Sequence, residues 1–410
     1  MLNALASSSV AGGRRRFATP ASGGGGSLPY TPPSAGVALA IGTNTADAVR
    51  PSGPSSFNWA YANFNGYGGG VFADDMGSYG SWMIASCGSH TAPCNNDALV
   101  FDFGTATWAR LANTSSASPV DPNHFMSTDY TASTDVSSDG WWELTATANN
   151  TPGASHTYNN SVYVSASVGS TTKGEYLRFG SFAAGNAGGK NGSIHKMNLA
   201  TGAWSRVTTG TRTDDYENVA VRVGSNVYFI QHLIHRNTNL QILALGTSVL
   251  DTTSGTGSAA DQSAGGVYHC TDYDPGRNWL ISHQSNFAPR VLQLSNLAAG
   301  WISLAETNGG SRPQDANRWA YSTTTLNFYT RGNADGNQCT KIVITGSTPG
   351  SASVTYSTLT FTGDALPNYT ATGSNDGRRH YSNFFYVPGL DCLAWVSGET
   401  NSVIIAKPAS

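Results

Sequence analysis

Residues 100–111 read Val-Phe-Asp-Phe-Gly-Thr-Ala-Thr-Trp-Ala-Arg-Leu, and this stretch decides the fold class. It contains an apolar strand, a turn of small residues, and a second strand that begins near a tryptophan. The same order recurs in Ile-His-Lys-Met-Asn-Leu-Ala-Thr-Gly-Ala-Trp-Ser-Arg-Val at 194–207 and in Val-Leu-Gln-Leu-Ser-Asn-Leu-Ala-Ala-Gly-Trp-Ile-Ser-Leu at 291–304. Short strands joined by tight turns are typical of antiparallel hairpins. The chain is therefore predicted to be all-β and to contain an internal repeat.

The tryptophans of the three hairpins, Trp108, Trp204 and Trp301, are separated by 96 and 97 residues, and each is followed three positions later by an apolar residue. Half of each separation is about 48 residues, close to the roughly 50-residue period of a kelch repeat. The hairpins resemble the outer hairpin of kelch blades in propellers of the galactose-oxidase type. That resemblance implies a β-propeller over about residues 56–406, in which the tryptophan packs between neighbouring blades.

Blades of four antiparallel strands can be followed along the chain from residue 69 onward. The last segment holds only three strands, and residues 36–42 supply a fourth strand that closes the ring. The predicted fold is one six-bladed propeller with an inserted loop at 114–150. A degenerate seventh blade at 114–150 is the alternative, because Trp142-Glu143-Leu144 imitates an outer strand. The six predicted blades span 69–113, 155–208, 218–251, 265–305, 317–362 and 380–406.

Residues 1–55 differ in composition from the propeller, which we expect to occupy 56–410. A glycine-rich run at 22–27 and a proline-rich run at 29–33 are typical of a flexible and then extended arm. Three arginines follow an apolar stretch near the N-terminus, which reverses the order found in a signal peptide. We expect the arm to dock to a partner subunit through Arg14, Arg15, Arg16 and Tyr30.

Charged residues make up 11% of the chain, and the formal net charge is −3. Nucleic-acid binding is disfavoured, because it needs a basic surface that replaces counterions. Membrane insertion is not expected, since no stretch reaches the ~20 apolar residues of a membrane-spanning helix. The five cysteines do not form a disulfide framework. Cys87 and Cys94 either form a local bridge or remain thiols, whereas Cys270, Cys339 and Cys392 are expected to be buried small groups.

No pattern of catalytic or metal-binding residues is complete. His232 and His235 invite comparison with a copper site, but residues three apart on a strand point to opposite faces. Asp214, Asp215 and Glu217 can supply carboxylates for glycoside hydrolysis, which needs two of them about 5–9.5 Å apart; a solvated turn is the favoured alternative. No zinc motif occurs. We therefore predict no catalytic residues, no metal and no cofactor.

Aromatic residues in loops are better candidates for ligand binding. Trp141 and Trp142 are adjacent on a predicted strand, so that one side chain can face inward while the other faces outward. Aromatic rings suit flat contacts with sugars and partner proteins, and packing beneath a long loop is the alternative. The predicted ligand-binding residues are Trp141, Trp142, Tyr67, Arg378, Arg379 and Tyr381.

Glycine, serine, threonine and asparagine supply most of the polar surface. Together with the low charge and the arm, this composition resembles that of bacteriophage virion proteins of the tail, fibre or capsid surface. The resemblance implies a non-enzymatic structural protein, assembled into the virion in the host cytoplasm, that docks to other virion subunits and presents its propeller to host-surface glycans. The alternative is a carbohydrate-active enzyme, either a glycoside hydrolase or a copper oxidase, on the same scaffold.

Overall fold

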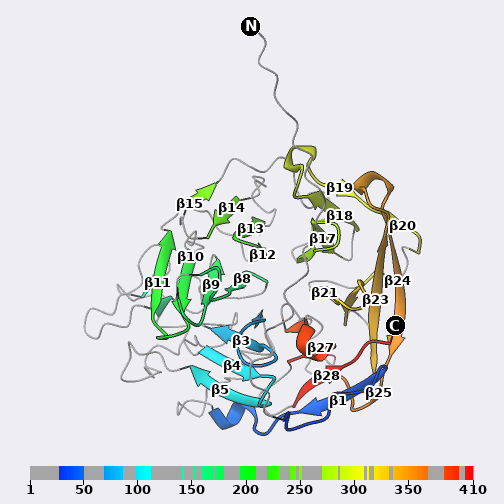
Figure 1. Ribbon diagram of the computed structural model, residues 1–410. Helices are drawn as coiled ribbons and strands as arrows, with labels where there is room; N and C mark the ends of the chain where they lie inside the picture. The colour runs from blue at the N-terminus through cyan, green and yellow to red at the C-terminus, as the bar shows by residue number, and fades with distance from the viewer. Residues whose placement is uncertain are drawn as a thin grey trace, which may run out of the picture.

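Six β-sheets surround a common axis in the computed structural model of the chain (Figure 1). Each sheet is one blade of a β-propeller, so the predicted six-bladed all-β fold is confirmed. The helices of the described residues are short 3-10 turns, and none is long and apolar enough to cross a membrane. The structure describes residues 27–49, 69–85, 98–111, 141–142, 151–152, 159–169, 171–179, 194–208, 219–230, 241–245, 249–251, 270–284, 287–308, 312–313, 318–331, 336–367, 383–396 and 402–409.

The first four blades have four strands each, in sequence order from the axis outward. Blade 1 contains β2 (Val71–Ala73), β3 (Ser81–Ala85), β4 (Ala98–Asp102) and β5 (Thr107–Leu111), and blade 2 contains β8 (Ser161–Val164), β9 (Glu175–Phe179), β10 (Ile194–Asn198) and β11 (Trp204–Thr208). Blade 3 contains β12 (Val219–Val223), β13 (Asn226–Ile230), β14 (Gln241–Ala244) and β15 (Val249–Asp251), and blade 4 contains β16 (Cys270–Asp274), β17 (Trp279–Gln284), β18 (Phe287–Gln293) and β19 (Ile302–Ser303).

The last two blades each gain a fifth strand at the outer edge. Blade 5 contains β21 (Ala320–Tyr321), β22 (Phe328–Thr330), β23 (Gln338–Thr345) and β24 (Ser353–Thr360), with β20 (Ala305–Glu306) parallel to β24. Blade 6 contains β26 (Phe384–Val387), β27 (Cys392–Trp395) and β28 (Val403–Ala406), followed outward by β1 (Val37–Ile41) and β25 (Thr362–Gly363).

The three tryptophan hairpins form the predicted antiparallel pairs β4–β5, β10–β11 and β18–β19. Trp108 packs in a cluster with residues of blade 6, Trp204 packs with residues of blade 1, and Trp301 packs against a cluster that includes blade 3. Each tryptophan therefore fills the interface with the preceding blade of the ring. This confirms the predicted packing between blades, although the kelch assignment itself stays a prediction.

The inserted segment does not add a seventh blade. Its described residues form only β6 (Trp141–Trp142), which pairs in a two-stranded sheet with β7 (Thr151–Pro152), just beyond the segment. The inner strands β2 and β8 share one core cluster, with Val71 and Ala73 of blade 1 packed together with Tyr163 of blade 2. Blades 1 and 2 are thus direct neighbours, and no blade lies between them.

The predicted N-terminal closing strand is confirmed as β1, which completes blade 6 (Figure 1). It pairs with β28 in antiparallel register, from Ala38 opposite Ala406 to Ile41 opposite Val403. On its other side β1 pairs in parallel with β25, which continues directly from β24 of blade 5. Strand β1 is therefore held on both edges, and β25 ties blade 5 to the closure of the ring.

A Thr-Asn dipeptide covers the outer edge of blade 1, where backbone groups would otherwise be open to another strand. The Thr43 backbone N–H donates to the Ala106 carbonyl at 2.7 Å, and the Thr43 and Thr107 hydroxyls are 2.8 Å apart. The Asn44 amide then imitates a paired strand: its Oδ1 accepts from the Trp108 N–H at 2.7 Å, and its Nδ2 donates to the Trp108 carbonyl at 3.0 Å.

Blade 5 repeats the same edge cap with an unrelated segment. The Thr307 N–H donates to the Val354 carbonyl at 3.1 Å, and the Thr307 and Thr355 hydroxyls are 2.6 Å apart. Asn308 accepts from the Tyr356 N–H at 3.0 Å and donates to the Tyr356 carbonyl at 2.5 Å. The same atoms make the same hydrogen bonds in both caps, so blades 1 and 5 protect their outer edges in the same way.

Replacing both Asn44 and Asn308 with alanine is expected to lower the free energy of unfolding by about 1–3 kcal/mol and to promote self-association. Each substitution removes two hydrogen bonds and reopens a strand edge. Denaturant unfolding and sedimentation velocity measure the two effects. The exposed Ser357→Ala on β24 is the control. A double variant that remains monomeric and as stable as the original chain would contradict the role of the caps.

Candidate functional site

The inner strands of all six blades enclose a cavity of about 440 Å³ on the propeller axis. Successive residues of a strand point to opposite sides, so each inner strand can present side chains to the axis and to a neighbouring blade. Eight of the lining residues are aromatic, and four carry charged side chains. The aromatic residues are Phe72, Tyr163, Tyr273, Trp319, Tyr321, Phe384, Phe385 and Tyr386, and the charged ones are Asp74, Arg222, Asp272 and Arg318.

One charged pole of the cavity lies on blades 1 to 3. Arg222 follows the middle of β12 and reaches blade 2, where its Nη1 donates to the Tyr163 carbonyl at 3.1 Å and its Nη2 to the Ser165 hydroxyl at 3.2 Å. The buried Tyr163 hydroxyl donates in turn to the Asp75 carboxylate. Burial and this hydrogen bond both raise the pKa of Tyr163, so the phenol stays protonated. Asp74, beside Asp75, is exposed at the cavity wall.

The other charged pole joins blades 4 and 5 around the buried carboxylate of Asp272. It accepts from Arg318 Nε at 2.9 Å, from the Trp319 backbone N–H at 2.8 Å, and from His283 Nε2 at 2.9 Å. Burial lowers the pKa of His283 against the opposing effect of Asp272, so the imidazole is neutral and Nε2 carries its proton. The ring of His283 also stacks on Trp319, with centroids 3.9 Å apart. Asp272 thus fixes the indole in the cavity wall.

The tyrosines of blades 4 to 6 are held by the turns near them. Tyr273 donates to Asn278 Oδ1 at 3.0 Å, and Tyr386 donates to Asp391 Oδ1 at 2.6 Å. Burial, with the Asp274 carboxylate nearby, raises the pKa of Tyr321 to about 12. Each phenol is therefore neutral at physiological pH. The rings of Tyr273 and Tyr386 have fixed orientations, as a preformed binding surface requires.

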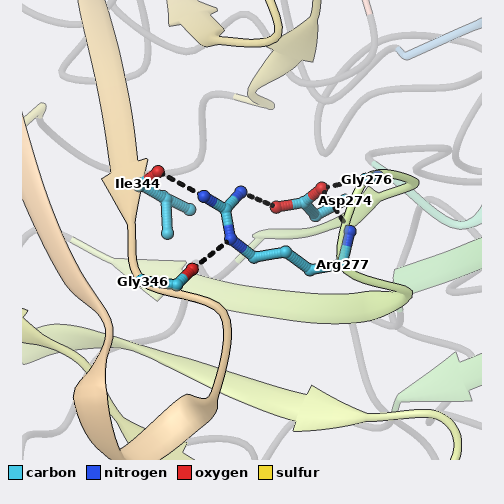
Figure 2. Close-up of polar contacts among 5 residues, drawn as sticks. All are labelled: Asp274, Gly276, Arg277, Ile344 and Gly346. Atoms are coloured by element: carbon cyan, nitrogen blue, oxygen red, sulfur yellow. Dashed lines mark hydrogen bonds and ion pairs between the residues drawn. The ribbon is translucent and has the colours of Figure 1, made fainter.

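A set of hydrogen bonds around Arg277, which we call the polar clamp, connects blade 4 with blade 5 (Figure 2). Arg277 donates through Nη1 to the fully buried Asp274 carboxylate at 2.7 Å. Its Nε and Nη2 donate to the carbonyls of Gly346 and Ile344 in blade 5, at 2.8 and 2.5 Å. Asp274 also accepts the backbone N–H groups of Gly276 and Arg277, at 2.9 and 3.1 Å. The turn after β16 is thereby locked to the end of β23.

Most of the ligand-binding residues expected from the sequence are not placed. Trp141 and Trp142 form strand β6, but nothing is described of their side chains. The other predicted ligand-binding residues lie outside the described residues: Tyr67, Arg378, Arg379 and Tyr381. Of the arm residues, Arg14, Arg15 and Arg16 also lie outside the described residues, as do the histidine and carboxylate candidates at 232, 235 and 214–217.

Tyr30 is the one predicted docking residue that the structure describes. Its ring packs against the core between blades 1 and 6, and its hydroxyl donates to the Phe103 carbonyl at 2.7 Å. This part of the arm therefore contacts the chain's own propeller. The cysteines at 270, 339 and 392 are buried thiols, as predicted, whereas Cys87 and Cys94 lie outside the described residues.

The residues of the axial cavity were not identified from the sequence. A usable signal exists in the inner strands, because an aromatic residue stands within or just after the strand in five of the six blades: Phe72, Tyr163, Tyr273, Tyr321 and Tyr386. Aligning those strands by their apolar residues would have brought out this ring. Blade 3 departs from it, because Arg222 occupies the corresponding part of β12.

Comparisons with known proteins do not place the chain in a family. No known family matches it, and no curated protein does either. Matching solved structures include a structural genomics protein of unknown function from Bacteroides thetaiotaomicron, at 10% identity over 90% of this chain and 74% of that chain, with a TM-score of 0.45. An alpha-L-arabinanase from Penicillium chrysogenum, complexed with arabinobiose, matches at 11% identity over 90% and 97%, with a TM-score of 0.45.

A chain of a mitotic checkpoint complex matches at 8% identity over 88% of this chain and 94% of that chain, with a TM-score of 0.42. These likenesses are too distant to carry any argument about function. The functional interpretation consequently rests on the cavity of this chain.

Proposed function

We propose that the chain is a non-enzymatic interaction protein whose propeller binds a neutral glycan in the axial cavity. The observation that carries this proposal is the cavity wall, in which aromatic rings stand beside equal numbers of positive and negative side chains. A sugar ring offers apolar faces that pack on aromatic rings and hydroxyls that bond to polar groups. The two aspartates and two arginines balance, so a charged ligand would bury a net charge without a counterion.

We further propose that the chain is a bacteriophage virion component, displayed on the particle by its N-terminal arm. The composition and the glycine- and proline-rich arm support this proposal. Strand β1 and the packed Tyr30 anchor the base of such an arm in the propeller. Mass spectrometry of purified particles tests it, since the chain should be present there in fixed ratio to other virion subunits.

Glycan binding is tested by incubating the purified full chain on an array of neutral and acidic glycans. We expect a neutral glycan to bind, and Tyr321→Leu to weaken its binding at least tenfold, because leucine keeps apolar bulk but removes the flat ring and the hydroxyl. Thr358→Ala, an exposed residue of the outer strand β24 in blade 5, is the control. An array with no bound glycan, or equal binding by the Tyr321 variant and the control, would refute binding at this site.

A glycoside hydrolase is the second candidate. It is favoured by Asp74 and Asp272, two carboxylates from different blades that line the same cavity, since hydrolysis uses such a pair. The same samples distinguish the two functions: hydrolysis would release new reducing ends from a bound glycan, whereas binding alone would leave the glycan intact.

A further inference from the structure

We propose that the ligand is read at the pole formed by Asp74 and Arg222, and that the chemical group recognised is a vicinal diol, a pair of hydroxyls on adjacent carbons of a neutral saccharide. This inference rests on the proposed glycan binding and specifies its chemistry. It follows from a difference between the two charged poles of the cavity.

At one pole, the Asp272 carboxylate is already occupied by hydrogen bonds within the chain. This carboxylate accepts three hydrogen bonds, from Arg318, Trp319 and His283. A carboxylate has about four acceptor positions, and the side chain of Asp272 is only 5% exposed. Its role is to hold Arg318 and Trp319 in the wall, which makes it a positioning residue.

The Asp74 pole is arranged differently. Arg222 is held by three neutral acceptors, the third being the Gly224 carbonyl, 3.2 Å from Nε. Among the described residues no carboxylate forms an ion pair with Arg222, and a guanidinium has five N–H donors. Asp74 lines the same cavity, is exposed, and is close enough to Arg222 for their charges to interact. The two groups thus face a shared space with opposite charge.

Tyr163 connects the two sides of this pole. Its carbonyl accepts from Arg222, and its hydroxyl donates to Asp75, the neighbour of Asp74. The turn after β8 packs tightly around the phenol: Gly174 has a φ of +83°, and a Cβ there would lie 2.5 Å from the Tyr163 hydroxyl. Arg222 and the neighbour of Asp74 in the chain are consequently held in place before any ligand arrives.

A vicinal diol matches this pair of charges. One hydroxyl donates to the Asp74 carboxylate while its neighbour accepts from the Arg222 guanidinium, and both hydrogen bonds are strengthened by the charged partner. An anionic sugar would be repelled by the Asp74 carboxylate, and a cationic one by the Arg222 guanidinium. A neutral saccharide avoids both repulsions.

Isothermal titration calorimetry of the full chain tests this inference. The probes are methyl α-D-glucopyranoside, methyl α-D-mannopyranoside, methyl β-D-galactopyranoside and sodium D-glucuronate. We expect a neutral glycoside to bind, and Asp74→Asn to reduce its affinity about tenfold or more. Asp47→Asn, which makes the same charge change on an exposed 3-10 turn, should leave the affinity unchanged.

A deoxygenated analogue of the bound glycoside, lacking either hydroxyl of one adjacent pair, should lose a similar factor. A glycan that binds the original chain and the Asp74→Asn variant equally would overturn this inference alone. Preferential binding of glucuronate would also overturn it. No binding by any glycoside, together with an empty glycan array, would overturn the proposed function as well.

Discussion

Replacing Arg277 with alanine is expected to lower the free energy of unfolding by about 3 kcal/mol, because it leaves the charge of Asp274 buried without its partner. Asp274 is 0% exposed, and Arg277 supplies its only ion pair among the described residues. The substitution also leaves the carbonyls of Ile344 and Gly346 without the guanidinium that joins blade 4 to blade 5 (Figure 2). The two backbone N–H groups that Asp274 retains keep the loss at the lower end of the range for broken buried pairs.

Chemical denaturation of the single variants Arg277→Ala and Asp274→Ala and of the double variant measures this effect. The double variant should be less destabilised than the sum of the two singles by at least about 1 kcal/mol, because the second substitution removes a group that the first has left unpaired. Lys341→Ala, a partly exposed cation on β23, is the matched control and should cost much less. Additive losses would show that Asp274 does not depend on Arg277 as the partner of its buried charge.

Deleting residues 1–42 is expected to abolish the folded propeller. The deletion removes β1, and with it the four paired residues on β28 and the burial of Ala38 and Ile41. Burying one large aliphatic side chain contributes about 1.5–3 kcal/mol, and net stabilities are about 5–15 kcal/mol. The loss of a whole strand is therefore comparable with the net stability of the fold. It also exposes the edge of β28 to other chains.

Deleting only residues 1–26 is the matched control, because it keeps β1 and the packed Tyr30. Size-exclusion chromatography and thermal melting followed by circular dichroism distinguish the two. We expect the shorter deletion to give a monomer that melts like the full chain, and the longer one to aggregate without a cooperative transition. A monomeric, cooperatively melting chain without residues 1–42 would mean that the ring closes without β1.

The repeating architecture was accessible from the sequence because its signals are local. Each tryptophan hairpin lies within a dozen or so consecutive residues, and the closing strand follows from the missing fourth strand of the last blade. The cavity was not accessible in this way. Asp74 and Arg222 belong to blades 1 and 3, and they line one cavity only because the ring places the inner strands around one axis. A local sequence motif contains no information about which residues of different blades line the same cavity.

The same limit explains the other differences. In the sequence nothing distinguishes Asp272 from other strand residues. Its role follows from the fold, which brings His283 and Arg318 to its carboxylate. The Thr-Asn caps at 43–44 and 307–308 are inconspicuous dipeptides whose partners lie on distant strands. The aromatic loops that attracted attention in the sequence stand out by composition alone, and composition does not say which side chains share a cavity.

The position of β1 between two neighbours has a mechanical consequence. Strand β1 pairs with β28 from Ala38 to Ile41 on one edge, and with β25 at Val37 and Ala38 on the other. If a particle holds the propeller by the preceding arm, tension along β1 loads these bonds together in shear, instead of opening them one after another. Forced unfolding is governed by the rate of barrier crossing, so simultaneous loading slows detachment. The strand that completes the ring would then also serve as the anchor that withstands pulling by a bound host surface.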